Sequence, residues 1–194
     1  MIAPIIGSII QMYYPSSASF QVGITISLLM IFFNYQNNMI QKDPLTGFKN
    51  RQVLERYFDR LITPHLSPLS IIMIDVNKFK RINDEYGHLV GDQALQTTAT
   101  VLKNYFIQNH PSSDLYRYGG DEFLIVMPGI EENSFVKKIR YIREKIDNTK
   151  VPGYPELKLS VSIGGVVSDG RPIQYAIDKA DKLMYKAKIR KNMV

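Results

Sequence analysis

Charge is distributed very unevenly along this 194-residue chain. Residues 1–41 contain no Asp, Glu, Lys or Arg, and every charged residue lies from Lys42 onward. Within the neutral stretch, the run FQVGITISLLMIFFNY (20–35) is almost continuously apolar. A soluble helix needs a polar face, whereas about 20 apolar residues can cross a bilayer as a helix. We therefore expect one or more transmembrane helix segments within 1–41, with 18–37 just long enough to span, followed by one domain over 42–194.

Two other interpretations of the N-terminal stretch are weaker. Ser16 and Ala18 are small residues that could mark the cleavage point of a signal peptide, but no basic segment precedes them and a second apolar run follows directly. A buried soluble helix is disfavoured by the total absence of charge. Lys42, Lys49 and Arg51 follow the neutral stretch, and positive residues stay inside, so the domain is expected in the cytoplasm at the inner membrane.

Composition excludes several classes of site. The chain has no cysteine, which rules out disulfides, thiolate metal ligands and thiol nucleophiles. Its formal net charge is +6, which favours an anionic partner such as a nucleotide, a nucleic acid or an acidic membrane surface.

Apolar periodicity from residue 42 onward predicts one domain of the α/β class. The run LSIIMIDV (69–76) is typical of a central strand, and 114–128 and 157–167 are also strand-like. Asn50 can cap a first helix that continues to Leu61. Apolar residues at spacings of three and four predict further helices after Asp92, through 135–146 and through 173–187. The alternating order of these elements fits a sheet flanked by helices.

The segment DLYRYGGDEFLIVMP (114–128) places two glycines and two acids between two strand-like runs. It predicts a hairpin in which glycine supplies the positive φ of a two-residue turn. The two acids could simply face solvent, but Asp75 also ends a buried strand and has no basic residue just before it. If the hairpin lies beside that strand, Asp75, Asp121 and Glu122 converge at one edge. Oxygen ligands of this kind favour Mg²⁺ and suit attack on a nucleotide phosphate.

Residues downstream of Asp75 support a nucleotide. Lys80 can neutralise phosphate, while Asn83 and Asp92 offer the donor and acceptors that would select a guanine edge. His88 lies in the same segment. Ordinary structural roles are also open to three of these residues: Asp92 as a helix N-cap, Asn83 as a turn residue, and His88 as a packing or loop residue.

Taken together, these motifs resemble those of the GGDEF-domain diguanylate cyclases. The resemblance covers 43–190 and rests on five ordered segments: DPLTGFKNR (43–51, with Phe48 where leucine is usual), IDVNKFKRINDEYGHLVGD (74–92), RYGGDEF (117–123), SVSIGG (160–165) and ADKLMYKAK (180–188).

The resemblance implies a polymerase-palm or nucleotide-cyclase-like central sheet flanked by helices. It implies a homodimer that condenses two GTP into cyclic di-GMP in bacterial signalling and releases pyrophosphate. Mg²⁺ would be the metal, with Mn²⁺ as the alternative, and no nucleic acid would be involved. The neutral N-terminus is similar to that of membrane-anchored members, and the resemblance implies a truncated N-terminal membrane region.

The resemblance also implies residue roles. Asp75, the Val76 carbonyl, Asp121 and Glu122 would form the metal site, and Asp121 or Glu122 would assist loss of the 3′-hydroxyl proton. The substrate-binding residues would be Asn83 and Asp92 at guanine, His88 near the substrate, and Phe79, Lys80 and Lys188 by the phosphates.

Two departures from the family pattern bear on activity. The usual ending Ala-Lys-x-x-Gly-Arg-Asn is replaced by AKIRKNMV (187–194), so Asn192, or Lys191 if one residue is deleted, stands in place of a phosphate-binding arginine. The inhibitory Arg-x-x-Asp motif reads PSSD (111–114), which predicts a weakened product brake. Alternative functions are a catalytically weak module that binds GTP or cyclic di-GMP and acts through a partner, and a synthase of another cyclic nucleotide.

Overall fold

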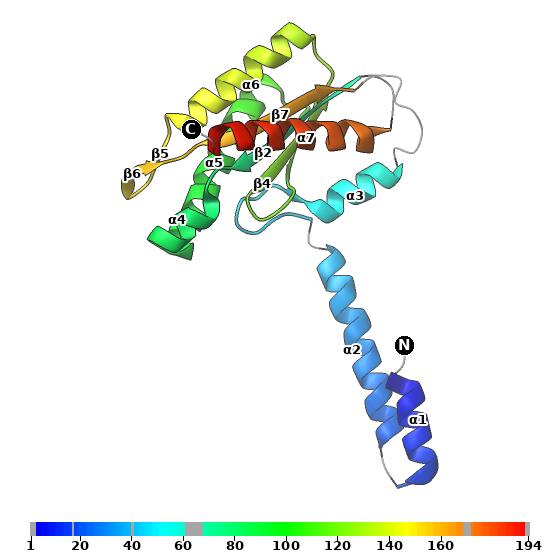
Figure 1. The fold of residues 1–194 in the computed structure, drawn as a ribbon. Coiled ribbons are helices and arrows are strands. Elements are labelled where there is room, and N and C mark those ends of the chain that lie inside the picture. The colour runs from blue at the N-terminus through cyan, green and yellow to red at the C-terminus, as the bar shows by residue number, and fades with distance from the viewer. Residues whose placement is uncertain (1–2, 17, 40, 61–67, 169–171, 193–194) are drawn as a thin grey trace. The chain divides into compact units, whose positions relative to one another are not determined.

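The computed structural model describes residues 3–16, 18–39, 41–60, 68–168 and 172–192 (Figure 1). The chain divides into two compact units, residues 1–41 and residues 42–194.

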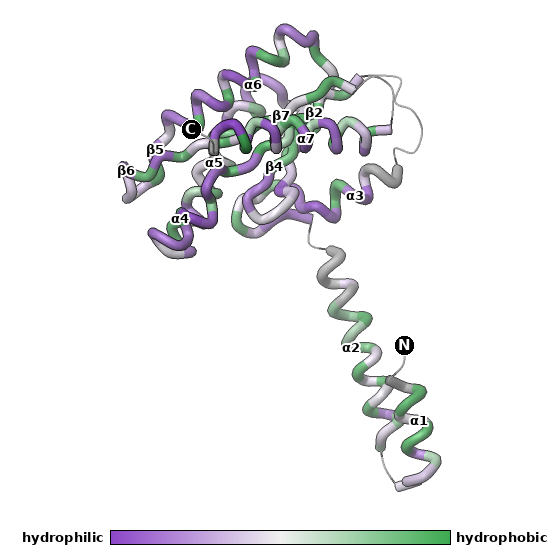
Figure 2. Tube along the Cα trace, viewed as in Figure 1, coloured by the Kyte–Doolittle hydropathy of each residue, from purple (hydrophilic) through white to green (hydrophobic). Residues whose placement is uncertain are grey.

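The first unit is a pair of helices, α1 (Ala3–Tyr13) and α2 (Ser19–Met39). They approach closely at Gly7, where a Cβ atom would lie 2.5 Å from the Ser19 carbonyl oxygen. The Ser19 hydroxyl donates a hydrogen bond to the Gly7 carbonyl at 3.1 Å. Figure 2 shows hydrophobic residues along both helices, and most of their large apolar side chains are exposed.

The expected transmembrane helix is not confirmed. Among the described residues, no helix is both long enough and apolar enough to cross a membrane. The expected span 18–37 lies almost wholly in α2, whose sequence includes Gln21 near its start and amide residues at 36–38 near its end. These polar residues lower the mean hydropathy of the helix.

The second unit is built on a five-stranded sheet in the order β1-β3-β4-β2-β7. All neighbouring strands are antiparallel except β1 and β3, which are parallel. The sheet strands are β1 (Lys49–Asn50), β2 (Leu69–Val76), β3 (Asp114–Arg117), β4 (Glu122–Pro128) and β7 (Val161–Val167). A separate hairpin is formed by β5 (Lys150–Val151) and β6 (Tyr154–Lys158). The helices are α3 (Arg51–Arg60), α4 (Phe79–Tyr86), α5 (His88–Asn109), α6 (Glu132–Asp147) and α7 (Ile173–Asn192).

Both faces of the sheet are covered, which explains why β2 is apolar throughout. Ile72 and Ile74 pack into a core formed with α5 and α6, whereas Ile71 and Met73 pack into a second core with α3 and α7. Successive side chains of a strand point to opposite faces, so a central strand covered on both faces needs apolar residues at every position. Each such side chain contributes roughly 1.5–3 kcal/mol of burial free energy.

Several sequence predictions are confirmed. The central strand has the predicted bounds 69–76. Asn50 caps α3, since its Oδ1 accepts a hydrogen bond from the Val53 N–H at 3.0 Å. The predicted end of that helix at Leu61 lies outside the described residues.

Other predictions were wrong in detail. The stretch 157–167 is not one strand, because β6 ends at Lys158 and β7 starts at Val161. The helix predicted after Asp92 starts at His88, because Gly87 has a φ of 87° and interrupts the chain between α4 and α5. Val90 and Gly91 then donate their N–H groups to the Gly87 carbonyl. Asp92 therefore lies inside α5 and is not its N-cap.

Candidate active site

The predicted convergence of acids occurs at one end of the central sheet. Asp75 of β2 lies directly opposite Glu122 of β4 in the antiparallel register. The Val76 N–H donates a hydrogen bond to the Asp121 carbonyl at 3.1 Å, so the loop before β4 is joined to the end of β2. Asp75 is only 2% exposed. A hairpin beside the central strand thus brings Asp75, Asp121 and Glu122 to one place, as the sequence predicted.

The glycine pair has a different role from the predicted one. The loop between β3 and β4 spans four residues, 118–121, and neither Gly119 nor Gly120 has a positive φ. A Cβ atom on Gly119 would lie 2.5 Å from the Glu122 Oε2 atom, whereas one on Gly120 would meet nothing within 4 Å. Gly119 therefore leaves room for the Glu122 carboxylate where it lies, and any side chain at 119 would make that carboxylate move.

The carboxylates of this group repel one another, and one lysine partly neutralises their charge. Burial raises the pKa of Asp75, and the nearby charge of Asp121 adds to the rise, although a hydrogen bond from Lys188 opposes it. Burial likewise raises the pKa of Glu122, with further contributions from Asp75, Asp121 and Asp181. The Lys188 Nζ atom on α7 lies 2.7 Å from Asp75 Oδ2.

Lys188 itself remains firmly charged. Burial alone would lower its pKa, but the hydrogen bond with Asp75 and the surrounding negative charges raise it. The sequence placed Lys188 near the substrate only through family resemblance; the structure places it at the acids.

These residues fit a hard divalent cation. Within the described part of the chain, no three side chains of His, Cys, Asp or Glu form a ready metal-binding cluster. However, Asp75 Oδ1 is buried without a hydrogen-bond partner. A cation would satisfy this oxygen and relieve the repulsion between the acids. Carboxylate oxygens together with a backbone carbonyl suit Mg²⁺ or Mn²⁺, which keep waters or phosphate oxygens in the remaining positions.

The predicted base-recognition residues lie where α4 packs against α5. Asn83 Oδ1 is buried and has no hydrogen-bond partner. It lies so close to the backbone of Gly91 that no Cβ atom could be accommodated there, and the Phe79 ring lies beside it. Asp92 follows Gly91 and is exposed. An unpaired amide oxygen beside an exposed carboxylate provides hydrogen-bonding groups for a ligand.

Two other predicted substrate-binding residues, Lys80 and His88, make no described interaction with the acids. Lys80 is exposed on α4, and His88 is exposed at the first position of α5.

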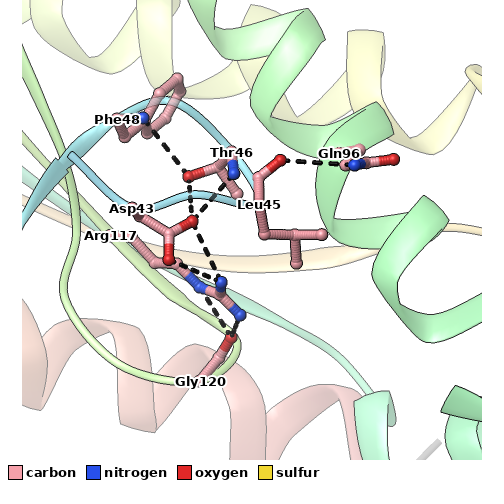
Figure 3. A network of polar contacts seen from close by, with 7 residues as sticks. All are labelled: Asp43, Leu45, Thr46, Phe48, Gln96, Arg117 and Gly120. Atoms are coloured by element: carbon pink, nitrogen blue, oxygen red, sulfur yellow. Dashed lines mark hydrogen bonds and ion pairs between the residues drawn. The ribbon is translucent and has the colours of Figure 1, made fainter. Parts of the chain in front are cut away.

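A polar network missed by the sequence analysis holds the glycine loop (Figure 3). Asp43 accepts hydrogen bonds from the Thr46 N–H at 2.8 Å and the Thr46 hydroxyl at 2.7 Å. Arg117 Nη1 lies 3.0 and 2.9 Å from the two Asp43 oxygens, and its Nη2 donates to the Gly120 carbonyl at 2.8 Å. Arg117 therefore ties the 43–46 turn to the loop that carries Asp121. Asp followed by Thr three residues later is a turn signature that could have indicated the first half of this network.

The network also stabilises the ionised form of Asp43. Burial would raise the pKa of Asp43, but hydrogen bonds from Thr46 and the charge of Arg117 outweigh burial and lower it.

The two sequence departures can be located. Asp114 pairs with Lys49 at 2.6 Å, so the acid of the altered inhibitory motif already has a basic partner. Lys191 Nζ donates to the Val161 carbonyl at 3.1 Å, and Val161 lies opposite Val76. Of the two residues that could replace the family's arginine, Lys191 is thus at the acidic end of the sheet. The side chain of Asn192 lies outside the described residues.

The Asp43–Arg117 pair should be energetically coupled. We expect Arg117→Gln to lower the free energy of unfolding by about 1.5–3 kcal/mol, because it leaves a largely buried carboxylate without its charged donor. Asp43→Asn should have a similar effect, and the double variant should lose less than the sum, with a coupling on the order of 1 kcal/mol or more. Urea denaturation measures all three. Arg81→Gln, which breaks an exposed pair with Glu85, is the control and should have a much smaller effect on stability. Additive losses at Asp43 and Arg117 would show that the two residues act independently.

Glu122 should destabilise the metal-free protein at neutral pH. Its folded-state pKa is raised, so the cost is absent below its unfolded pKa and appears as the pH rises through the folded value. Glu122→Gln should therefore increase the melting temperature by roughly 1–3 °C at neutral pH without divalent metal. The gain should vanish near pH ~3, well below the unfolded pKa, where the glutamate is protonated in both states. Thermal scans across pH measure the effect, with Glu156→Gln, at an exposed acid on β6, as the unaffected control. A gain that persists at pH ~3 would contradict this electrostatic origin.

Comparisons with known proteins agree with the site. A family model described as "Diguanylate cyclase, GGDEF domain" matches residues 40–193. Diguanylate cyclase DosC of Escherichia coli K12 is 37% identical over 168 residues, which cover 82% of this chain and 35% of DosC. An uncharacterized membrane protein of Staphylococcus saprophyticus is 34% identical over 185 residues, covering 88% of this chain and 51% of that protein.

A solved structure shows the same fold. The crystal structure of a sensory box/GGDEF family protein from Caulobacter crescentus CB15 superposes with a TM-score of 0.63 at 31% identity, covering 77% of this chain and 99% of that one. This chain thus spans only 35% of the length of DosC, but it covers 99% of the chain in that crystal structure. The family match includes the acids at the sheet end, the α4–α5 pair and the glycine loop. The chain belongs to the GGDEF-domain diguanylate cyclase family.

Proposed function

We propose that this protein is an active diguanylate cyclase. It condenses two GTP into cyclic di-GMP with release of pyrophosphate, depends on Mg²⁺ or Mn²⁺, and works as a homodimer. The observation that carries the proposal is the direct pairing of Asp75 with Glu122 at one end of the sheet, with an unsatisfied oxygen on Asp75 and Lys188 beside it. A domain that only bound nucleotide would have no need to hold repelling acids together.

The acids and Lys188 would act on the phosphates and the attacking hydroxyl. Asp75, the Val76 carbonyl, Asp121 and Glu122 would hold the metal, which when bound supplies positive charge for the phosphates and the attacking oxygen. Glu122 or Asp121 would accept the proton of the 3′-hydroxyl as its oxygen attacks the α-phosphorus of the second GTP in line. Lys188, released from Asp75, would offset charge on the departing pyrophosphate. The raised pKa of Glu122 brings this carboxylate closer to the range in which a general base works.

The α4–α5 pair would select guanine. Guanine presents N1–H beside its exocyclic amine, and the free Asn83 Oδ1 and the Asp92 carboxylate are acceptors for such donors. Phe79 lies beside Asn83 and, with Lys80, would lie by the phosphates. His88 would lie near the substrate. One domain would bind only one of the two GTP molecules. Pairing of two domains therefore supplies the orientation that the reaction needs.

The activity should depend on the acids. Full-length protein incubated with GTP and Mg²⁺ should yield cyclic di-GMP and pyrophosphate, resolved by chromatography. Asp75→Asn and Glu122→Gln should each lower turnover by about 100-fold or more, because metal binding or proton transfer is lost. Glu156→Gln serves as the matched control.

Other outcomes separate the alternatives. Near-normal turnover in both acid variants would refute the assigned chemistry. GTP or cyclic di-GMP binding without turnover in the wild type would instead support a signalling module that acts through a partner, a reading to which the altered 187–194 ending points.

We also propose that residues 1–41 attach this protein to the inner membrane, with the catalytic domain in the cytoplasm. These residues are uncharged, and α1 and α2 expose apolar side chains such as Ile6 and Leu29 at 51% and 50%. The exposed rings of Tyr13 and Tyr35 suit the membrane interface, where aromatic residues are enriched. The Staphylococcus saprophyticus relative is named as a membrane protein, which supports membrane association. Since no described helix is long and apolar enough to span, we propose contact through these apolar side chains.

Membrane attachment should resist salt. In fractionated cells, the full chain should remain with membranes after a high-salt wash and be released by detergent, because apolar contacts are insensitive to ionic screening. Deletion of residues 1–41 should move the protein to the soluble fraction. Release of the full chain by salt alone would show that the basic stretch from Lys179 to Lys191 holds it electrostatically.

A further inference from the structure

The connection between β2 and α4 is short and conformationally demanding. Only Asn77 and Lys78 separate the end of β2 from the start of α4. Lys78 has a φ of 56°, in the left-handed region that a non-glycine residue rarely adopts. Such a conformation persists only when the surrounding structure holds it. The residues on either side, Val76 and Phe79, both belong to the proposed active site.

Asn77 holds this connection with three hydrogen bonds. Its side chain is buried, with 6% of the residue exposed. Its N–H donates to the Ser160 carbonyl at 2.9 Å, and its Nδ2 donates to the Ser160 hydroxyl at 3.0 Å. Its Oδ1 accepts from the hydroxyl of Ser162, a fully buried residue of β7, at 2.6 Å. We call Asn77, Ser160 and Ser162 the Asn77 clamp.

The register places the clamp directly at the proposed metal ligands. In the β2–β7 pair, Ser162 lies opposite Asp75 and Val161 lies opposite Val76. The clamp therefore fixes the chain immediately after the Asp75 carboxylate and the Val76 carbonyl. Its members carry no formal charge, so they add nothing to the repulsion among the acids.

We propose that Asn77, through Ser160 and Ser162, is a positioning residue that aims the Val76 carbonyl and the Asp75 carboxylate at the divalent cation. The inference rests on the proposed function. Asn77 touches neither metal nor substrate. Asparagine suits the role because its amide supplies the donor for Ser160 and the acceptor for Ser162 at once.

A purely structural role would give a different pattern across variants. Asn77→Ala removes both side-chain hydrogen bonds, and Ser162→Ala removes one. Asn77→Asp can keep both, because the two serine hydroxyls can act as donors to a carboxylate. It should lower stability through the added buried charge and yet retain cation binding. Stability and metal affinity would thus separate.

Ser70 provides a matched control. Like Ser162 it is a fully buried serine with one side-chain hydrogen bond, from the Ile130 N–H at 3.3 Å. It lies near the opposite end of β2, across from Met127. Ser70→Ala should lower stability without affecting the acids.

The experiment measures Mn²⁺ binding to the full-length chain, from the paramagnetic resonance signal of free Mn²⁺, alongside urea unfolding of each variant. We expect Asn77→Ala to weaken Mn²⁺ binding by about tenfold or more and Ser162→Ala by a smaller factor. Asn77→Asp should bind within a fewfold of wild type, and Ser70→Ala should bind as wild type does. If Asn77→Ala does not fold, Ser162→Ala against Ser70→Ala still decides the matter.

Two results would overturn the inference in distinguishable ways. If wild type binds Mn²⁺ and Asn77→Ala and Ser162→Ala bind it equally well, the clamp is structural only, and the proposed function stands. If wild type binds no more Mn²⁺ than Asp75→Asn does, the proposed metal site fails and the inference fails with it.

Discussion

A carboxylate buried at the end of the central strand is the constraint on which the rest of this domain depends. Asp75 is almost fully buried, and this burial, together with the charges of Asp121 and Asp181, raises its pKa. An uncompensated buried charge is expensive, so the surroundings must offset it. Lys188 from the last helix does so in part, and one oxygen of Asp75 still lacks a partner. The remaining negative charge and the unpaired oxygen of Asp75 favour the binding of a cation.

The fold keeps these acids in place with clamps on two sides of β2. On one side, Arg117 ties the loop before β4 to the Asp43 turn (Figure 3). On the other side, Asn77 ties the end of β2 to β7. The rigid sheet fixes the register, and the clamps fix the loops that the sheet cannot control. Gly119 completes the arrangement by leaving room for the Glu122 carboxylate. Repulsion among the acids thus lowers the stability of the fold, and the surrounding hydrogen bonds offset this loss, as is common at functional sites.

The two units of the chain differ in how they place their apolar side chains. Residues 42–194 bury their apolar side chains in two cores, one on each face of the sheet. Residues 1–41 instead leave large apolar side chains exposed on two helices that contact each other at Gly7. Exposed apolar surface of this extent marks a site of interaction. The proposed membrane contact would account for it without requiring a spanning helix.

The sequence by itself determined the features that depend on local pattern. The apolar run 69–76 forms the central strand at the predicted bounds, and Asn50 caps α3 as predicted. The meeting of Asp75 with Glu122 was also predictable, because a hairpin beside a strand that ends in an acid leaves few other arrangements. The expected membrane span was not confirmed, since the amide residues in the sequence of α2 lower its mean hydropathy.

Only the tertiary structure decided the features that depend on long-range contact. The bond from Arg117 to Asp43 joins residues 74 positions apart, and the bond from Ser162 to Asn77 joins residues 85 apart. No periodicity or local propensity encodes such pairs. The space that Gly119 leaves for the Glu122 side chain likewise depends on packing rather than on backbone dihedrals. Local sequence specifies which elements form, whereas the packing of those elements decides which polar groups meet, because hydrogen bonds and excluded volume act between atoms that only the folded chain brings together.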